Sequence, residues 1–327
     1  MSNLLTVSPS PHVHASDTVQ KIMYRVIIAL IPALIWSVVV FGWDALRVTL
    51  IAVIASVGFE YLAQKYIMKV RPSVTDGSAL ITGLLLAFNV PANLPWWIII
   101  LGALAAVGIG KLSFGGLGTN IFNPALVGRV FLLISFPVQM TSYPVPRMSD
   151  VDAVTAATPL GLLKEGLMNG QPVSELLGQL PTATDLLIGN MGGSLGEISA
   201  LMLIIGGLYM LLRKVITWHT PVAVLGSMFV MAGTFWLVNP EMYMEPAYHL
   251  LTGGAMLGAI FMATDMVTSP MTGKGQIIYG VGIGVITMSI RLFGAYPEGI
   301  SFAILIMNAF TPLINNTVKP KRFGGKK

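Results

Sequence analysis

The sequence contains no cysteine among its 327 residues. This absence excludes disulfide bonds, thiolate metal sites and any iron–sulfur cluster ligated by the chain itself. Histidine is also scarce, and the four histidines are too scattered to suggest a haem or zinc site: His12, His14, His219 and His249. We expect no cleavable signal peptide, because residues 1–20 are polar and the first apolar run is too long.

Charged residues are rare as well, at 10% of the chain, against about 25% in an average soluble domain. Hydrophobic residues make up 54%, and long apolar runs recur along the whole sequence. The net charge of +5 does not indicate nucleic-acid binding, because the basic residues cluster at the ends of apolar segments. The composition predicts an integral membrane protein that crosses the lipid several times.

Ten apolar segments are expected to form membrane helices: 22–42, 46–66, 77–89, 95–110, 121–137, 198–213, 219–238, 247–263, 276–293 and 300–315. The third and fifth are short, which favours tilted, broken or partly buried helices over plain lipid-facing spans.

Basic residues lie on one side of this arrangement if all ten segments span the membrane: Lys21, Arg25, Lys65, Lys69, Arg71, Lys111, Arg213, Lys214, Lys274 and the tail 319–327. The opposite connections are neutral or acidic. The positive-inside rule therefore places both termini in the cytoplasm and the 138–197 loop outside.

Two halves of the chain show weak similarity. "ALITGLLLAF" (79–88) resembles "HLLTGGAMLGAIF" (249–261), and "NIFNPALVG" (120–128) resembles "IMNAFTPLI" (306–314). Two five-helix halves must face the membrane in opposite directions, because five is odd. The predicted fold is an all-α polytopic membrane protein with about ten transmembrane helices in two inverted five-helix repeats.

This fold divides the chain into five parts: a cytoplasmic tail (1–21), the first repeat (22–137), an extracytoplasmic loop (138–197), the second repeat (198–315) and a basic cytoplasmic tail (316–327). An ordered loop as long as 138–197 is usually functional. Within it, Thr158 and Pro159 are typical of a helix start, and a short helix is expected over 159–168.

The stretch "DAVTAAT" also resembles a flavinylation signal, D-x-x-[S/T]-G-A-T, in which the last threonine is esterified to FMN. Asp152, Thr155, Ala157 and Thr158 match the pattern, whereas Ala156 replaces the usual glycine. The two interpretations are compatible, because the amides and dipole of a helix N-terminus favour a phosphate.

Several longer stretches resemble the D subunits of the Rnf complex, the ion-translocating ferredoxin:NAD oxidoreductase. They are "SPSPHVHASDTVQKIMYRVIIALIPA" (8–33), "TDGSALITGLLLAFNVP" (75–91), "GGLGTNIFNPALVGRVFL" (115–132), "DAVTAATPL" (152–160), "FMATDMVTSPMTGKGQIIYG" (261–280) and "YPEGISFAILIMNAFTPLI" (296–314). The B subunit of the sodium-translocating NADH:quinone reductase belongs to a sister family.

The resemblance implies FMN bound covalently to Thr158, attached by an FAD:protein FMN transferase outside the bacterial cytoplasmic membrane. It also implies a non-covalent riboflavin in some members. The expected partners are the other membrane and peripheral subunits of the complex, including iron–sulfur subunits and a second FMN-bearing subunit. The expected function is electron transfer coupled to Na⁺ or H⁺ movement.

Three polar residues follow the glycines of "GGLGTNIFNPA" (115–125). Asn120 and Asn123 either satisfy backbone groups at a broken helix or line a flavin or ion site. Arg129 lies inside an apolar run, where a charge is a functional hypothesis. Its partner is left open between a flavin carbonyl, a lipid phosphate and a carboxylate such as Glu60.

A second polar stretch, "TDMVTSPMTGKG" (264–275), contains Asp265 and Thr268. It forms either a capped, solvated turn or a cation or flavin site with hard oxygen ligands suited to sodium. No metal-ligating residues are expected in the chain.

Three functions remain open: a redox subunit with a tethered flavin, a urea-channel-like transporter, and a structural anchor for other subunits. A B-type subunit of a sodium-translocating NADH:quinone reductase is an alternative form of the first. The flavinylation signal favours the redox subunit, because a passive channel has no use for one.

Overall fold

The computed structural model describes residues 17–146, 155–178 and 180–319. In the N-terminal half the apolar segments form α1 (Val19–Phe41), α2 (Trp43–Leu62), α3 (Ser78–Phe88), α4 (Trp96–Leu104) and α5 (Pro124–Ser135). Helices α2 and α4 each end in a π-helical turn, Ala63–Ile67 and Ala105–Ile109. Short 3₁₀ turns follow at Val74–Asp76 and Leu112–Phe114.

The C-terminal half contains α10 (Ala200–Leu212), α11 (His219–Val238), α14 (Gly273–Phe293) and α15 (Ile300–Thr317). Its eighth apolar segment is interrupted. It consists of α12 (Pro246–Leu251), α13 (Ala255–Leu257) and a π-helical turn, Gly258–Met262. Gly253 takes a positive φ of 63° at the interruption, a conformation that glycine adopts without strain.

The connecting segment between the halves holds only short elements: α6 (Pro137–Thr141), β1 (Tyr143–Pro144), β2 (Thr155–Ala156), α7 (Pro159–Met168), α8 (Val173–Leu176) and α9 (Ala183–Ile188). Strands β1 and β2 pair antiparallel. The helix expected over 159–168 is confirmed by α7.

Six helices of the described chain are long and apolar enough to cross a membrane: α1, α2 with its π-helical turn, α4 with the residues to Phe114, α11, α14 and α15. Helices α3, α5 and α10 are apolar but shorter. The expectation that the third and fifth segments are short and partly buried is confirmed, since α3 and α5 bury much of their surface. The count of ten spans and the inverted repeat stay predictions.

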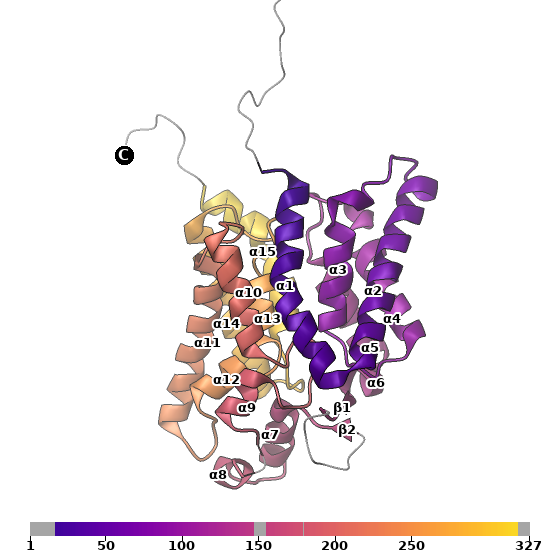
Figure 1. The fold of residues 1–327 in the computed structure, drawn as a ribbon. Coiled ribbons are helices and arrows are strands. Elements are labelled where there is room, and N and C mark those ends of the chain that lie inside the picture. Colours follow the sequence, from indigo (N-terminus) through magenta and orange to yellow (C-terminus); the bar gives the residue numbers. More distant parts are fainter. Residues whose placement is uncertain (1–16, 147–154, 179, 320–327) are drawn as a thin grey trace, which may run out of the picture.

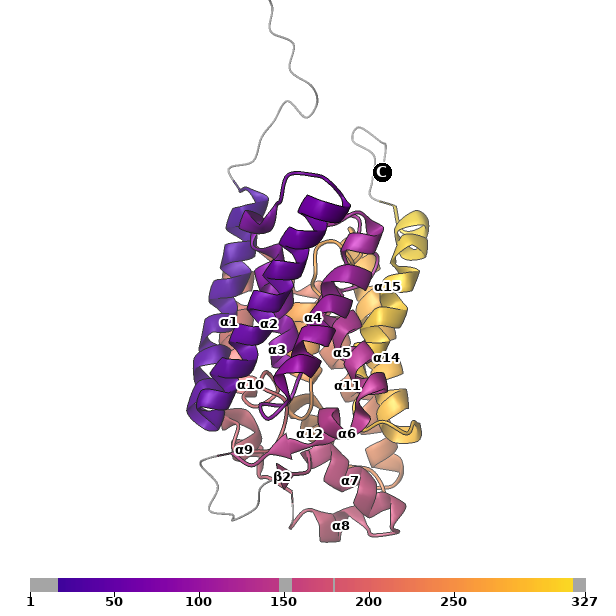
Figure 2. The same cartoon turned by 90° about the vertical axis from the view of Figure 1, so that its right-hand side faces the viewer.

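The long helices form one bundle, with α1–α5 on one side and α10–α15 on the other (Figure 1). Helix α1 packs on α10, α2 packs on α3 and α4, and α11 packs on α14. Helices α7–α9 lie at the opposite end from the start of α1 and the end of α15 (Figures 1 and 2). The compartment that each end faces stays a prediction.

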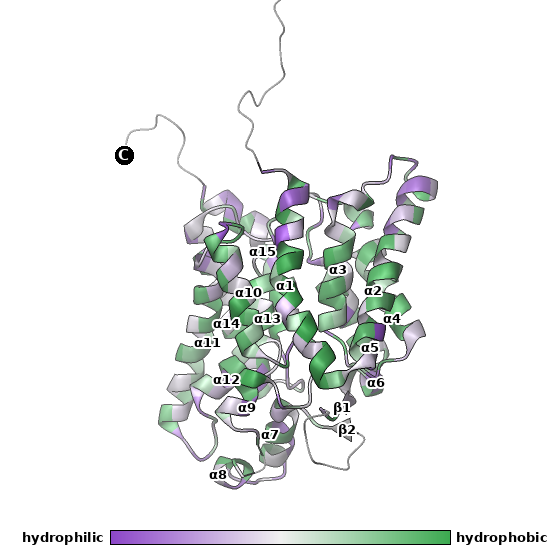
Figure 3. Cartoon of the chain, in the orientation of Figure 1, coloured by the Kyte–Doolittle hydropathy of each residue, from purple (hydrophilic) through white to green (hydrophobic). Residues whose placement is uncertain are grey.

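Hydrophobic residues cover the outside of the bundle as well as its interior. Ile54 and Val230 are large apolar side chains that remain 67% and 64% exposed. Green predominates along the middle of the long helices, whereas purple gathers where α1 begins and where α2 ends (Figure 3). An apolar belt with polar ends is what a bilayer requires of a membrane bundle.

Candidate functional site

Thr158 is the N-cap of α7, as the Thr-Pro pair predicts. Its Oγ1 accepts a hydrogen bond from the Gly161 amide at 3.1 Å, and Pro159 occupies the first helical position. The side chain is buried, at 8% exposure, while the preceding Ala157 is exposed. Thr155 lies in β2, where it pairs with Pro144, and Asp152 lies outside the described residues.

The N-terminus of α7 is suited to hold a phosphate. The first amides of a helix have no partner within it, and the aligned peptide dipoles favour negative charge there. No acidic residue occupies the first turn of α7 to compete for this position. The residues around Thr158 therefore fit a phosphoester on Oγ1, with the free phosphate oxygens near the amides of α7.

Helix α7 is hydrogen-bonded to the turn between α14 and α15. Lys164 Nζ donates to the Tyr296 carbonyl at 2.8 Å and also to the Gly294 carbonyl. Partial burial lowers the pKa of Lys164. Beside these contacts, α7, α12 and the end of α14 enclose a cavity of about 390 Å³.

Arg129, on α5, lies in a buried cluster with two carboxylates. Its Nη1 donates to Asn89 Oδ1 at 2.7 Å, and its Nη2 lies 3.2 Å from Glu197 Oε1. The same Nη2 also pairs with Glu298 Oε2. The alternative of Glu60 as its partner is wrong, because that carboxylate binds Lys111.

The two glutamates differ in their affinity for a proton. Burial and the neighbouring charge of Glu298 raise the pKa of Glu197 to about 8. Burial alone would raise the pKa of Glu298 too. The positive charges of Arg129 and Arg291, together with hydrogen bonds to Glu197 and Arg129, outweigh burial and hold that pKa below its usual value. Two carboxylates that share one arginine are most stable with a single proton between them.

The interruption between α12 and α13 supplies further partners to this cluster. The Gly254 amide donates to Glu298 Oε1 at 3.1 Å. Arg291 Nη2 donates to the Thr252 carbonyl at 3.1 Å, and its Nη1 donates to the His249 carbonyl. Arg291 thus binds two of the carbonyls that a continuous helix would have used.

Sequence reasoning missed Glu197, Glu298 and Arg291. The available signal was an arginine inside the apolar segment 276–293 and single glutamates in the connections before α10 and α15. These residues are distant in sequence, so no local pattern pairs them.

Asn120 and Asn123 lie away from the cluster that surrounds Arg129. Asn123 Oδ1 accepts from the Ala125 amide at 3.1 Å, and its Nδ2 donates to the Met262 carbonyl at 3.2 Å. Its role in satisfying backbone groups is therefore confirmed. Asn120 Nδ2 donates to the Phe122 carbonyl at 3.1 Å, whereas its buried Oδ1 has no hydrogen-bond partner among the described residues.

Asn120, Asn123 and Asp265 line a cavity of about 90 Å³, together with Lys111 and Ser78. Thr268 does not line it, but its Oγ1 donates to Asp265 Oδ2 at 3.1 Å. The described residues contain no group of three or more His, Asp or Glu side chains that could hold a metal ion.

Lys111 closes one wall of this second cavity. Its Nζ lies 2.7 Å from Glu60 Oε2 and 2.6 Å from Ser78 Oγ. Gln64 Nε2 donates to the other oxygen of Glu60 at 3.1 Å. Lys111 was expected to mark the cytoplasmic side as an end-of-helix cation. It is 1% exposed and neutralises a buried carboxylate, and its place on the cytoplasmic side stays a prediction.

Comparison with known proteins gives one family over nearly the whole chain. The model described as "NQR2, RnfD, RnfE family" matches residues 6–324. The chain is 48% identical to the D subunit of the Na(+)-translocating ferredoxin:NAD(+) oxidoreductase complex of Acetobacterium woodii, over 98% of this chain and 95% of that protein.

Two further relatives carry related names. The chain is 44% identical to the D subunit of the proton-translocating ferredoxin:NAD(+) oxidoreductase complex of Clostridium ljungdahlii, over 99% of this chain and 98% of that protein. It is 38% identical to the D subunit of the ion-translocating oxidoreductase complex of Escherichia fergusonii, over 98% of this chain and 99% of that protein.

Proposed function

Because this chain belongs to the NQR2, RnfD, RnfE family, we propose that it is the D-type membrane subunit of an ion-translocating ferredoxin:NAD⁺ oxidoreductase complex. The names of relatives at 38–48% identity support this activity. The six long apolar helices support its place in a membrane. One relative is named for protons and another for sodium ions, at similar identity, so the names do not select the transported ion.

We propose further that FMN is esterified to Thr158. An FAD:protein FMN transferase would form the bond between Thr158 Oγ1 and the FMN phosphorus while the pyrophosphate bond of FAD breaks and AMP leaves. The observation that carries this proposal is the position of Thr158 at the N-terminus of α7, where backbone amides stabilise the phosphate. Bound FMN supplies reversible electron transfer, and the protein holds and orients it.

The smaller cavity is a candidate for a second flavin or an ion. Asn120 offers a buried acceptor without a partner among the described residues, and Asp265 offers a carboxylate that Thr268 orients. Asn123 contributes to the wall but already uses both ends of its amide. Arg129 does not line this cavity, and its guanidinium binds Asn89, Glu197 and Glu298.

The proposed setting is the bacterial cytoplasmic membrane, with both termini in the cytoplasm and residues 138–197 outside. Electrons would pass through iron–sulfur subunits and a second FMN-bearing subunit, because a chain without cysteine cannot ligate a cluster through its own thiolates.

In-gel fluorescence tests the flavin attachment. The full chain is produced with a flavin transferase, denatured, separated by electrophoresis and viewed for flavin emission. We expect a fluorescent band in the wild type, no emission from Thr158→Ala, and full emission from Thr182→Ala. Thr182 is the matched control because it caps α9 in the same connecting segment and is exposed. A dark wild-type band, or a fluorescent Thr158→Ala band, would overturn the proposal.

A further inference from the structure

The cavity beside α7 has an unusual wall. Most of it is apolar, with Leu160, Leu163 and Leu167 of α7 facing Tyr243 and Phe293. Lys164, His249 and Arg291 interrupt this surface with basic or hydrogen-bonding groups. Such a combination suits a flat aromatic ligand with a polar edge, since the ring requires apolar walls and the edge requires a few fixed partners.

Two polar groups in this wall lack hydrogen-bond partners among the described residues. His249 Nδ1 and Arg291 Nε are both unpaired, although their residues are only 4% and 6% exposed. A buried polar group without a partner loses its hydrogen bonds to water and gains none in return, which destabilises the fold. Native proteins therefore pair such groups with protein, water or a ligand. Both residues line the same cavity, so a single occupant can contact both side chains.

We propose that the isoalloxazine ring of the flavin on Thr158 occupies this cavity, with its pyrimidine edge against His249 and Arg291. This inference rests on the proposed attachment to Thr158. Leu160 is in the cavity wall and lies two residues after Thr158, within roughly 7 Å along the chain. The ribityl phosphate chain of FMN bridges a gap of that size.

The hydrogen-bonding groups of the ring complement the polar side chains of the cavity wall. The pyrimidine edge of isoalloxazine alternates carbonyl acceptors with an N–H donor, so it can satisfy both His249 Nδ1 and Arg291 Nε. Positive groups near this edge favour the reduced ring, which carries more negative charge there. Arg291 and Lys164 provide that charge, whereas a lipid chain in the same space would leave the two buried groups unpaired.

A tryptophan placed in the wall tests the position of the ring. Tryptophan quenches flavin emission on contact. Leu167→Trp is therefore expected to change the ratio of native to denatured flavin fluorescence. Leu162→Trp is the matched control: Leu162 is also a half-buried leucine of α7 but does not line the cavity. Both variants keep the covalent flavin, so both show the denatured band of the wild type.

Variants of His249 give an independent readout that does not depend on inserting a large side chain. His249→Leu is expected to shift the midpoint potential of the tethered flavin to a more negative value and to alter its visible circular dichroism. His249→Gln restores a hydrogen-bonding group and is expected to recover most of both signals. The full chain, loaded with flavin in detergent, is titrated in each case.

The outcomes separate this inference from the proposed function. A wild-type chain without covalent flavin overturns both. If the covalent band is present but Leu167→Trp, Leu162→Trp and His249→Leu all retain wild-type native fluorescence and potential, then the flavin is attached and its ring lies elsewhere. A change in Leu167→Trp and His249→Leu, absent from Leu162→Trp, supports the assigned cavity.

Discussion

Lys111 Nζ and Glu60 Oε2 form an ion pair 2.7 Å apart, and their side chains are only 2% and 0% exposed. Glu60 belongs to α2, whereas Lys111 follows the π-helical turn at the end of α4. Ser78, the first residue of α3, accepts a further hydrogen bond from the same ammonium. One cation therefore holds three elements of the N-terminal half together.

Removing this cation is expected to destabilise the fold. Lys111→Met leaves Glu60 charged and buried without a counter-charge, which costs about 3–5 kcal/mol. The double variant Glu60→Gln/Lys111→Met is expected to regain most of that stability. Thermal unfolding in detergent, followed by circular dichroism, measures both. Arg47→Met is the control, because its pair with Asp44 is exposed and is worth about 1 kcal/mol or less.

The pH dependence of stability is expected to report Glu197. Its folded-state pKa of about 8 lies above the value of about 4.3 in an unfolded chain. Between these values the folded protein binds the extra proton, so stability falls as pH rises from about 4.5 to 8. The lowered pKa of Glu298 makes stability rise with pH, but only at pH values below this range.

Glu197→Gln carries a permanently neutral side chain and is expected to flatten this slope. Melting temperatures measured at several pH values between about 5 and 8 test the expectation. A wild-type protein that gains stability over the same range would contradict the assignment of the proton to Glu197.

The contact between α1 and α10 is expected to require a glycine. A Cβ at Gly206 would lie 2.2 Å from the Ala29 carbonyl oxygen. Gly206→Ala should therefore lower the free energy of unfolding by about 1–3 kcal/mol through overpacking. Gly226→Ala, on α11, meets no atom within 4 Å and should instead stabilise its helix by about 0.5–1 kcal/mol. Equal melting temperatures for the two variants would exclude a close approach of α1 and α10.

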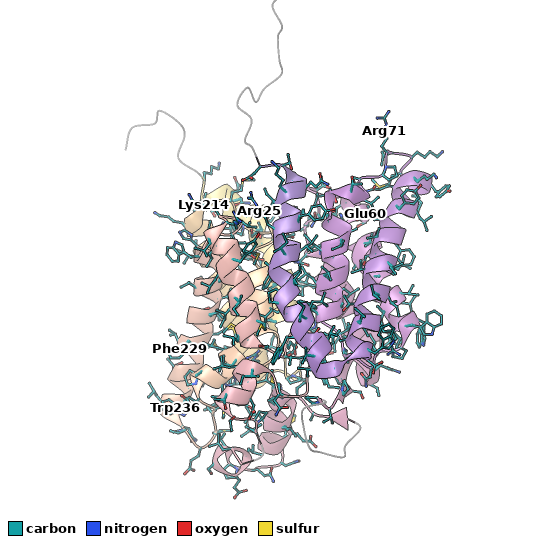
Figure 4. The ribbon with its side chains drawn as sticks, viewed as in Figure 1. Arg25, Glu60, Arg71, Lys214, Phe229 and Trp236 are labelled. Carbon is teal, nitrogen blue, oxygen red and sulfur yellow. The ribbon has the colours of Figure 1, made fainter. Side chains whose placement is uncertain are left out.

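Topology can be tested with reporters at the two ends of the bundle. Arg25, Arg71 and Lys214 all lie at one end, away from α7–α9 (Figure 4). A reporter inserted near Gly170, between α7 and α8, should be active only outside the cytoplasm, and one after Lys214 only inside. The positive-inside rule gives this orientation. A cytoplasmic signal at Gly170 would reverse the assignment.

Local signals predicted several elements with their boundaries. Helix α7 begins at Pro159 and ends at Met168, as Thr158-Pro159 implies, and α11 spans His219–Val238 as expected. In both cases the residues that set the helix lie within or beside it, as caps or as an uninterrupted apolar run.

The interruption of the 247–263 segment was not predicted, because its causes are not local. The carbonyls that it frees at His249 and Thr252 bind Arg291, and the Gly254 amide binds Glu298. The partners of Arg129 are also distant in sequence, because Glu197 and Glu298 follow it by 68 and 169 residues. Sequence reasoning recognised Arg129 as unusual but could not identify its partners, since ion pairing across a fold leaves no periodic pattern.

The turn at residues 294–298 touches two distant parts of the molecule. Lys164 of α7 binds the carbonyls of Gly294 and Tyr296, and Glu298 at the end of the same turn binds Arg129 of α5. The turn is a short covalent segment that contacts both a peripheral helix and the interior of the bundle. Only a few residues of backbone therefore separate the contacts of α7 from a buried charge in the opposite half of the protein.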